Sequence, residues 1–129
     1  MPDSYSKEPI VLREKLARFT EHWAPRTIAA MNDHEFKVVK LQGEFTWHDH
    51  QETDETFLVL DGEMEIQMRD RTVTLREGEM FVIPKGVEHC PRATLECHVL
   101  VIEREGTVNT GEPGFKRETP GDFWVYAHD

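Results

Sequence analysis

Short apolar runs follow one another along the middle of the chain, and polar or turn-forming residues separate them. These runs occupy residues 36–41, 57–60, 64–68, 72–75, 80–83 and 95–102. Apolar runs of about four to eight residues between turn signals are typical of β-strands. The pair Asp61-Gly62 lies between two of the runs and predicts a hairpin. Because no helical pattern intervenes, we expect an all-β sandwich or barrel over residues 27–105.

A different spacing precedes the strands. Leu12, Leu16, Phe19 and Trp23 recur every three or four positions, and prolines flank the pattern at both ends. This spacing predicts one amphipathic helix within residues 1–26. We expect it to pack on the outside of the barrel.

The last part of the chain, residues 106–129, is rich in glycine and proline and predicts an irregular tail of the same domain. Its closing run, residues 123–126, is apolar. We expect that run to form a short strand on an exposed sheet edge, either within the barrel or across a dimer. The tail therefore favours a homodimer.

Size and charge narrow the function classes. A chain of 129 residues is expected to form one domain. The net charge of −10 argues against nucleic acid and anionic membranes as partners. No apolar stretch approaches the roughly 20 residues of a membrane span, and no secretory signal is recognisable, so we expect a cytoplasmic protein. Cys90 and Cys97 are then expected to be free thiols that serve packing.

The candidate chemistry lies in the histidines. His48 and His50 are two residues apart, so on a strand both imidazoles face the same side. A polar turn can bring Glu55 back to them, and the turn before His89 can bring a third imidazole. Three imidazoles and one carboxylate suit one divalent transition metal ion, namely Fe, Mn, Ni, Co or Zn. Four ligands leave room on the ion for substrate, water or dioxygen.

Alternation also predicts what surrounds these ligands. Glu44 and Thr46 share the face of His48, and Phe57 shares the face of Glu55, so these three are expected to bind substrate. Trp47 faces the opposite way, where we expect it to pack against the helix or a second subunit.

The last apolar run has two faces. The series Leu95, Cys97, Val99 and Val101 predicts the inward face, which places His98 outside.

Acidic residues lie beside the ligands, in the turn that contains Asp49, Glu52 and Asp54. They are expected to be solvated. The alternative is that one of them orients the imidazole of a metal ligand.

The segment 43–62 resembles the first motif of the cupin superfamily, G-x₅-H-x-H-x₃₋₄-E-x₆-G. The second motif, G-x₅-P-x-G-x₂-H-x₃-N, is matched at Gly78, Pro84, Gly86 and His89. Two departures occur: Gly43 lies one residue nearer to His48, and Ala93 replaces the final Asn, which is not a ligand.

The flanks are similar to small single-domain cupins of the mannose-6-phosphate-isomerase-like group, which share a helix before the barrel and Gly-x-x-Asn-Thr-Gly after it. Here that signature spans residues 106–111. The resemblance implies a jelly-roll β-barrel, often a homodimer, with metal ligands His48, His50, Glu55 and His89. The group label itself is no evidence of isomerase activity.

These features favour a metal-dependent enzyme that acts on a small polar or oxygenated molecule, with oxygenase, isomerase and lyase chemistry all open. Glu55 is the candidate acid or base in catalysis, and Glu44 is a weaker one. The alternative is a non-catalytic, metal-containing module that binds a small ligand or a sugar. A third hypothesis is that the barrel and its metal only support a dimer surface.

Overall fold

The computed structural model describes residues 7–110. One short helix precedes seven strands, and every strand pair is antiparallel, so the expected all-β class is confirmed. The elements are α1 Leu12–Leu16, β1 Arg26–Met31, β2 His34–Glu44, β3 Glu55–Asp61, β4 Glu63–Met68, β5 Thr72–Arg76, β6 Met80–Ile83 and β7 His89–Arg104.

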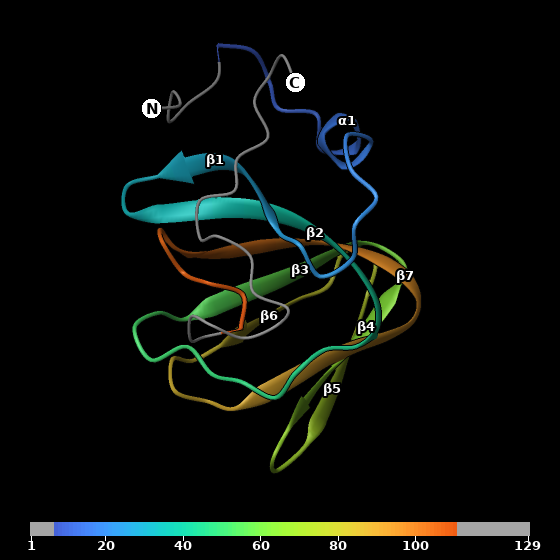
Figure 1. The fold of residues 1–129 in the computed structure, drawn as a ribbon, viewed down its shortest axis with the longest axis vertical. Helices are drawn as coiled ribbons and strands as arrows, with labels where there is room; N and C mark the ends of the chain where they lie inside the picture. Colours follow the sequence, from blue (N-terminus) through green and yellow to red (C-terminus); the bar gives the residue numbers. More distant parts are fainter. Residues whose placement is uncertain (1–6, 111–129) are drawn as a thin grey trace.

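Strand β7 organises the sheet. On one side it pairs with β2, from His34 opposite Arg104 to Glu44 opposite Arg92. On the other side its first part pairs with β4 and its last part with β3. Figure 1 shows β7 curving from the β4 side of the molecule round to β2. The strand thereby joins the two layers of a jelly roll.

The outer strands extend this arrangement. β1 pairs with β2, β6 with β3, and β5 with β4. Among residues 7–110 the pairing stops at β1, β5 and β6, so hydrogen bonds do not close the predicted barrel into a ring. The jelly roll holds its core between layers that meet along β7.

The Asp61-Gly62 pair does not form the predicted hairpin. Strand β3 already pairs with β6 and β7, so the chain must leave that layer before β4 begins. Gly62 makes this corner at φ +91°, and a Cβ there would lie 3.1 Å from the carbonyl oxygen of Glu96. The hairpin instead joins β4 to β5, where the amide of Met68 donates to the carbonyl of Arg71.

The inward face of β7 agrees with the predicted alternation at three of four positions. Cys97, Val99 and Val101 are buried in the main core, and His98 faces outward beside Glu96. Leu95 was expected inside but is 76% exposed. The reason is a register shift: β7 contains extra residues between Ala93 and Cys97, so the alternation breaks at Leu95.

The predicted helix is shorter than its pattern. α1 ends at Leu16, although Leu16 and Phe19 pack as expected with Ile28 and Val38. Figure 1 shows α1 on the outer side of β2. Tertiary contacts replace the helical ladder, because the ammonium of Lys40 donates to the carbonyl oxygen of Phe19 at 2.6 Å.

Trp23 leaves the helical pattern altogether. It adopts the left-handed conformation at φ +60°, and its side chain packs against the main core. Its amide donates to the carbonyl of Lys40 at 2.9 Å, and its indole N–H donates to that of Gln42 at 2.9 Å. The chain before β1 is therefore fixed to β2 as an irregular segment.

Within the described residues, no helix has the length and apolar character that crossing a bilayer requires. The expected strand at 123–126 lies outside the described residues, as does Gly111.

Candidate metal centre

The structure brings the four predicted ligand residues together inside the jelly roll. One ligand atom from each of His48, His50, Glu55 and His89 lies within 4.8 Å of the others. All four residues are at most 9% exposed. Glu55 begins β3 and His89 begins β7, whereas both other histidines lie in the connection between β2 and β3. The cluster therefore forms where distant parts of the sequence meet.

Backbone hydrogen bonds hold these segments in register. The amide of His48 donates to the carbonyl of His89 at 3.0 Å, and the amide of His89 donates back to the carbonyl of His48 at 2.9 Å. The carbonyl of His50 accepts the amide of Gly86 at 2.8 Å. The positions of the ligands therefore do not depend on their side chains.

Two of the imidazoles are oriented in the same way. Nδ1 of His48 lies 2.7 Å from the carbonyl oxygen of Thr46, and Nδ1 of His89 lies 2.8 Å from that of Val87. A carbonyl oxygen only accepts hydrogen bonds, so each Nδ1 carries a proton, and in the neutral imidazole each Nε2 keeps its lone pair. Fixing the tautomer in this way is typical of metal-ligating histidines.

His50 supplies the test of whether a metal fits. Its ring is 3% exposed, and neither ring nitrogen has a hydrogen-bond partner. Nε2 lies 3.3 Å from Oε2 of Glu55, a contact of ion-pair type. A buried polar atom without a partner is costly, and an ion between these side chains would remove that cost. The donor set therefore fits a transition metal.

The charges in the cluster differ from one residue to the next. Burial lowers the pKa of His48 to about 4, and the neighbouring His89 adds to this effect. Burial alone would raise the pKa of Glu55, but the neighbouring imidazoles of His50 and His89 outweigh it and hold that pKa well below its ordinary value. His48 is therefore neutral and Glu55 ionised at neutral pH, as metal ligands must be.

The pKa of His89 moves the other way. Burial opposes the charged imidazolium, but the contact of Nε2 with the accepting Oε1 of Glu55, at 3.2 Å, and the negative charge of Glu55 raise the pKa of His89 above the ordinary value.

A buried ion pair lies behind Glu55. The ammonium of Lys37 is 2.9 Å from Oε2 of Glu103, and both side chains are 3% exposed. The ammonium also donates to the carbonyl of Thr107 at 3.0 Å. Burial and the negative charge of Glu55 raise the pKa of Glu103 well above its ordinary value, although Lys37 opposes them.

Sequence reasoning missed this pair. The signal was present, because the inward alternation of Cys97, Val99 and Val101 continues to Glu103. In β2 the same alternation runs back from Leu41 to Lys37. A charged residue on an inward face should have been noted, since such residues are almost never buried unpaired.

A partly open cavity lies beside the cluster. His48 and Glu55 form part of its wall, and Phe57 lines it as predicted. The remaining wall is mainly apolar; besides the two ligands, its polar residues are Glu103 and Asn109. The cavity thus joins an apolar chamber to one side of the metal cluster.

The other two predicted substrate-binding residues lie elsewhere. Glu44 is exposed at the end of β2, where its carboxylate accepts a hydrogen bond from Gln67 at 3.4 Å and lies 4.0 Å from Arg92. Thr46 contributes its carbonyl to His48. The left-handed Gly43 and the nearby register shift change the alternation, so Phe45 lines the cavity instead. A role of Glu44 and Thr46 in substrate binding stays a prediction.

The acidic turn is involved in local contacts. Asp49 accepts a hydrogen bond from Gln51, and Asp54 accepts the amide of Lys85. Backbone carbonyls, and not these carboxylates, accept the Nδ1 protons of the two oriented histidines. Glu52 is exposed in the same turn.

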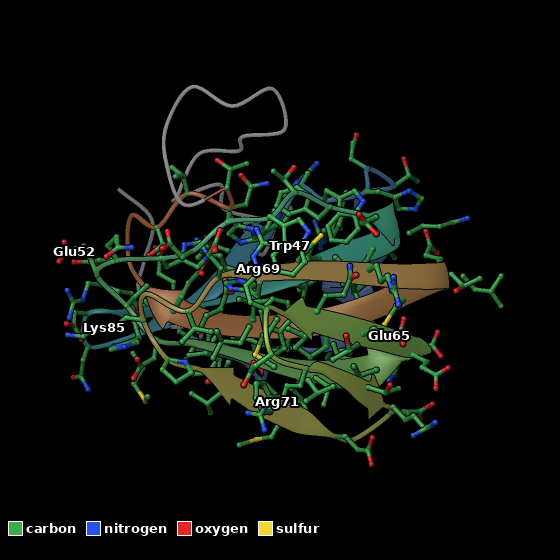
Figure 2. All side chains as sticks on the ribbon, turned by 90° about the horizontal axis from the view of Figure 1, so that it is seen from below. Trp47, Glu52, Glu65, Arg69, Arg71 and Lys85 are labelled. Atoms are coloured by element: carbon green, nitrogen blue, oxygen red, sulfur yellow. The ribbon has the colours of Figure 1, made fainter. Side chains whose placement is uncertain are left out.

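Trp47 points away from the cluster, as alternation predicted. Figure 2 shows it beside Arg69, whose guanidinium carbon lies 3.8 Å from the centre of the indole ring. Its partner in the structure is therefore strand β4 and its turn, not the helix.

The two cysteines have packing roles, as expected. Cys90 and Cys97 are free and buried. Burial raises the pKa of Cys97 to about 12, and the charges of Asp61 and Glu63 add to this effect. A thiol with such a pKa is a poor nucleophile.

Comparison with known proteins gives three kinds of match. Residues 35–103 match the family described as Cupin domain. An uncharacterised Bacillus subtilis protein, YdbB, is 34% identical over 95 residues, which cover 73% of this chain and 78% of that protein. The bovine 3-hydroxyanthranilate 3,4-dioxygenase is 32% identical over 80 residues, but these cover 57% of this chain and only 28% of the enzyme.

Solved structures extend the likeness to the fold. A cupin-2 domain protein from Shewanella frigidimarina is 52% identical with a TM-score of 0.73, and the match covers 74% of this chain and 94% of that one. A protein from Neisseria meningitidis is 36% identical with a TM-score of 0.70, covering 76% of this chain and 100% of that one.

Proposed function

The chain belongs to the cupin family, and from this premise we propose that it is a metal-dependent enzyme that acts on a small oxygenated molecule. The ligands are His48, His50, Glu55 and His89. The observation that carries the proposal is the buried His50 ring, whose nitrogens have no hydrogen-bond partner. The oriented imidazoles of His48 and His89 and the carboxylate of Glu55 lie beside it.

A divalent ion bound there supplies Lewis-acid chemistry and, if it is iron, dioxygen chemistry. The similarity to 3-hydroxyanthranilate 3,4-dioxygenases makes oxygenase chemistry the first to test, with isomerase and lyase chemistry after it. The match covers under half of those enzymes, so their substrate is not transferred to this chain.

The residues around the cluster have different roles. The backbone carbonyls of Thr46 and Val87 keep two imidazoles in the tautomer that leaves Nε2 free. Glu55 is the ligand best placed to accept or return a proton, because it lines the cavity and lies against Glu103. Lys37 fixes the position of Glu103 through the ion pair between them. The apolar wall keeps bulk water from a ligand in the cavity.

The alternative is a metal-containing module that binds a small ligand or a sugar without turnover. The cavity wall contains few polar groups, and Glu55 and Glu103 are the acid–base candidates among them. This scarcity of catalytic groups supports the alternative.

We also infer that the protein is a cytoplasmic homodimer. Two free buried thiols suit a reducing compartment. Strand β6 is a sheet edge whose Met80 and Val82 are 62% and 45% exposed, which suits contact with a second copy. Light scattering of the purified protein tests the dimer, and a monomeric mass would contradict it.

The first test of function is elemental analysis of protein purified without chelators or an affinity tag. We expect about one transition metal per chain in the wild type, a large loss in His50→Ala, and no loss in His98→Ala, whose imidazole lies on the surface beside Glu96. Wild-type protein that holds no metal even after reloading would overturn the proposal. Oxygen uptake with small diols and enols then separates the enzyme from the binding module.

A further inference from the structure

We propose that the cavity selects ligands that carry a flat, unsaturated ring, and that Trp23 and Phe45 are the residues that determine this specificity. The inference rests on the proposed function, because the metal cluster would hold the oxygen atoms of the same ligand. It adds the class of ligand, which the cluster alone leaves open.

The first observation is an aromatic wall that begins at a metal ligand. The ring of Phe45 meets His48 edge-on, with centroids 5.4 Å apart and planes at 90°. Trp23 stacks on Phe45 at 4.8 Å with an angle of 19° between the planes. Both aromatic residues line the cavity that reaches His48 and Glu55. A ligand bound at the cluster therefore meets aromatic side chains along one wall of the cavity.

The second observation is how firmly Trp23 is held. Its amide and its indole N–H donate to carbonyls of β2 residues Lys40 and Gln42, and its own carbonyl accepts the side-chain amide of Asn109 at 3.0 Å. These bonds maintain a left-handed backbone, which a residue with a bulky side chain rarely adopts. Such conformations persist where the surroundings enforce them, and they concentrate at ligand-binding sites.

The third observation is the character of the remaining wall of the cavity. Pro25, Phe57 and Pro91 complete much of the chamber, whereas the polar groups lie at the cluster and at Glu103 and Asn109. A sugar would leave many hydroxyl groups unpaired against such walls. A flat ring with oxygens at one end matches both the apolar walls and the polar end, and aromatic neighbours favour its π face.

The test compares three probes with the same two-oxygen chelating group on zinc-loaded protein. Benzohydroxamate carries a flat ring, cyclohexanecarbohydroxamate carries a puckered ring of similar size, and acetohydroxamate carries none. We expect calorimetry to show that the phenyl probe binds about threefold to tenfold tighter than the cyclohexyl probe. Since the chelating group is constant, the ratio reports the walls of the cavity.

Variants locate the source of this preference. Trp23→Leu is expected to bring the ratio close to one, and Trp23→Phe to restore most of it. The matched control is Trp47→Leu, which removes an indole that packs on Arg69 outside the cavity and should leave the ratio unchanged. Phe45→Leu serves as a second variant if Trp23→Leu does not fold, because the two rings form one stack.

The outcomes separate the two proposals. If the protein takes up no zinc, or if even acetohydroxamate does not bind to zinc-loaded protein, the proposed function is wrong and the inference fails with it. If all three probes bind and the flat ring has no advantage, only the inference is wrong. If Trp23→Leu lowers the affinity for benzohydroxamate and for cyclohexanecarbohydroxamate by the same factor, Trp23 supports the fold and does not determine specificity.

Discussion

His48 and His89 exchange two backbone hydrogen bonds, of 3.0 and 2.9 Å, although 40 positions separate them in the sequence. This single bridge joins the connection after β2 to the first residue of β7. Each of these histidines also has its Nδ1 against the carbonyl two residues before it. The backbone thus fixes both where the two imidazoles lie and which nitrogen each presents.

Replacing His89 by Ala should therefore remove metal without removing the fold. The bridge uses only main-chain atoms, so strand pairing survives, while metal affinity falls by at least about a hundredfold, beyond the effect of losing an outer partner of a ligand. Metal content after dialysis measures the loss of metal, and far-UV circular dichroism of the same sample measures whether the fold survives. Full metal content in His89→Ala would contradict the ligand assignment.

Acid should destabilise the metal-free protein through His48. Its pKa is about 4 in the folded state and about 6.5 in the unfolded chain, so the unfolded state binds more protons between these values. The stabilisation is complete above pH 6.5 and is lost as pH falls toward 4, by roughly 3 kcal/mol. Urea unfolding at pH 7 and at pH 4.5 measures the loss.

His48→Gln is the comparison for that experiment, since Gln cannot take up the proton. The variant should lose less stability than the wild type over the same pH range. Equal slopes would mean that other groups, such as Glu55, cause the acid sensitivity.

The ligand cluster was predictable because its signal is local. The spacing of His48, His50 and Glu55, together with the turn before His89, brings metal-competent residues within reach of one another. The confirmed inward face at Cys97 and Val101 has the same origin, since alternation within one strand does not depend on its neighbours.

The wrong predictions concern positions where pairing between distant strands determines the course of the chain. Leu95 lies outside because β7 contains extra residues opposite β2, and Asp61-Gly62 turns a corner because β3 already has two neighbours. Trp23 leaves its helical pattern for hydrogen bonds to β2. Each of these partners lies far along the sequence from the pattern that it disrupts.

Removing the buried cation at Lys37 should be costly. Lys37→Met leaves Glu103 buried without its partner at 2.9 Å. Breaking such a pair costs up to about 3–5 kcal/mol, and the raised pKa of Glu103 reduces this cost because the carboxyl can take up a proton. The double variant Lys37→Met/Glu103→Gln should recover most of this loss, because it removes the second charge as well. Urea unfolding of the two single variants and the double variant gives the coupling energy. Additive losses would show that the two side chains do not stabilise each other.

The corner at Gly62 can be tested against a matched glycine. Gly78 also has a left-handed backbone, at φ +82°, but a Cβ there would meet nothing within 4 Å, so Gly78→Ala reports the backbone cost alone, about 1–2 kcal/mol. Gly62→Ala adds a contact of 3.1 Å with the carbonyl oxygen of Glu96, which belongs to the backbone of β7 and cannot move away cheaply. We expect a further loss of about 1–3 kcal/mol, as for overpacked sites. Thermal unfolding of both variants measures the difference; equal losses would mean that β7 yields at Glu96, and that close packing of this corner does not hold the two layers together.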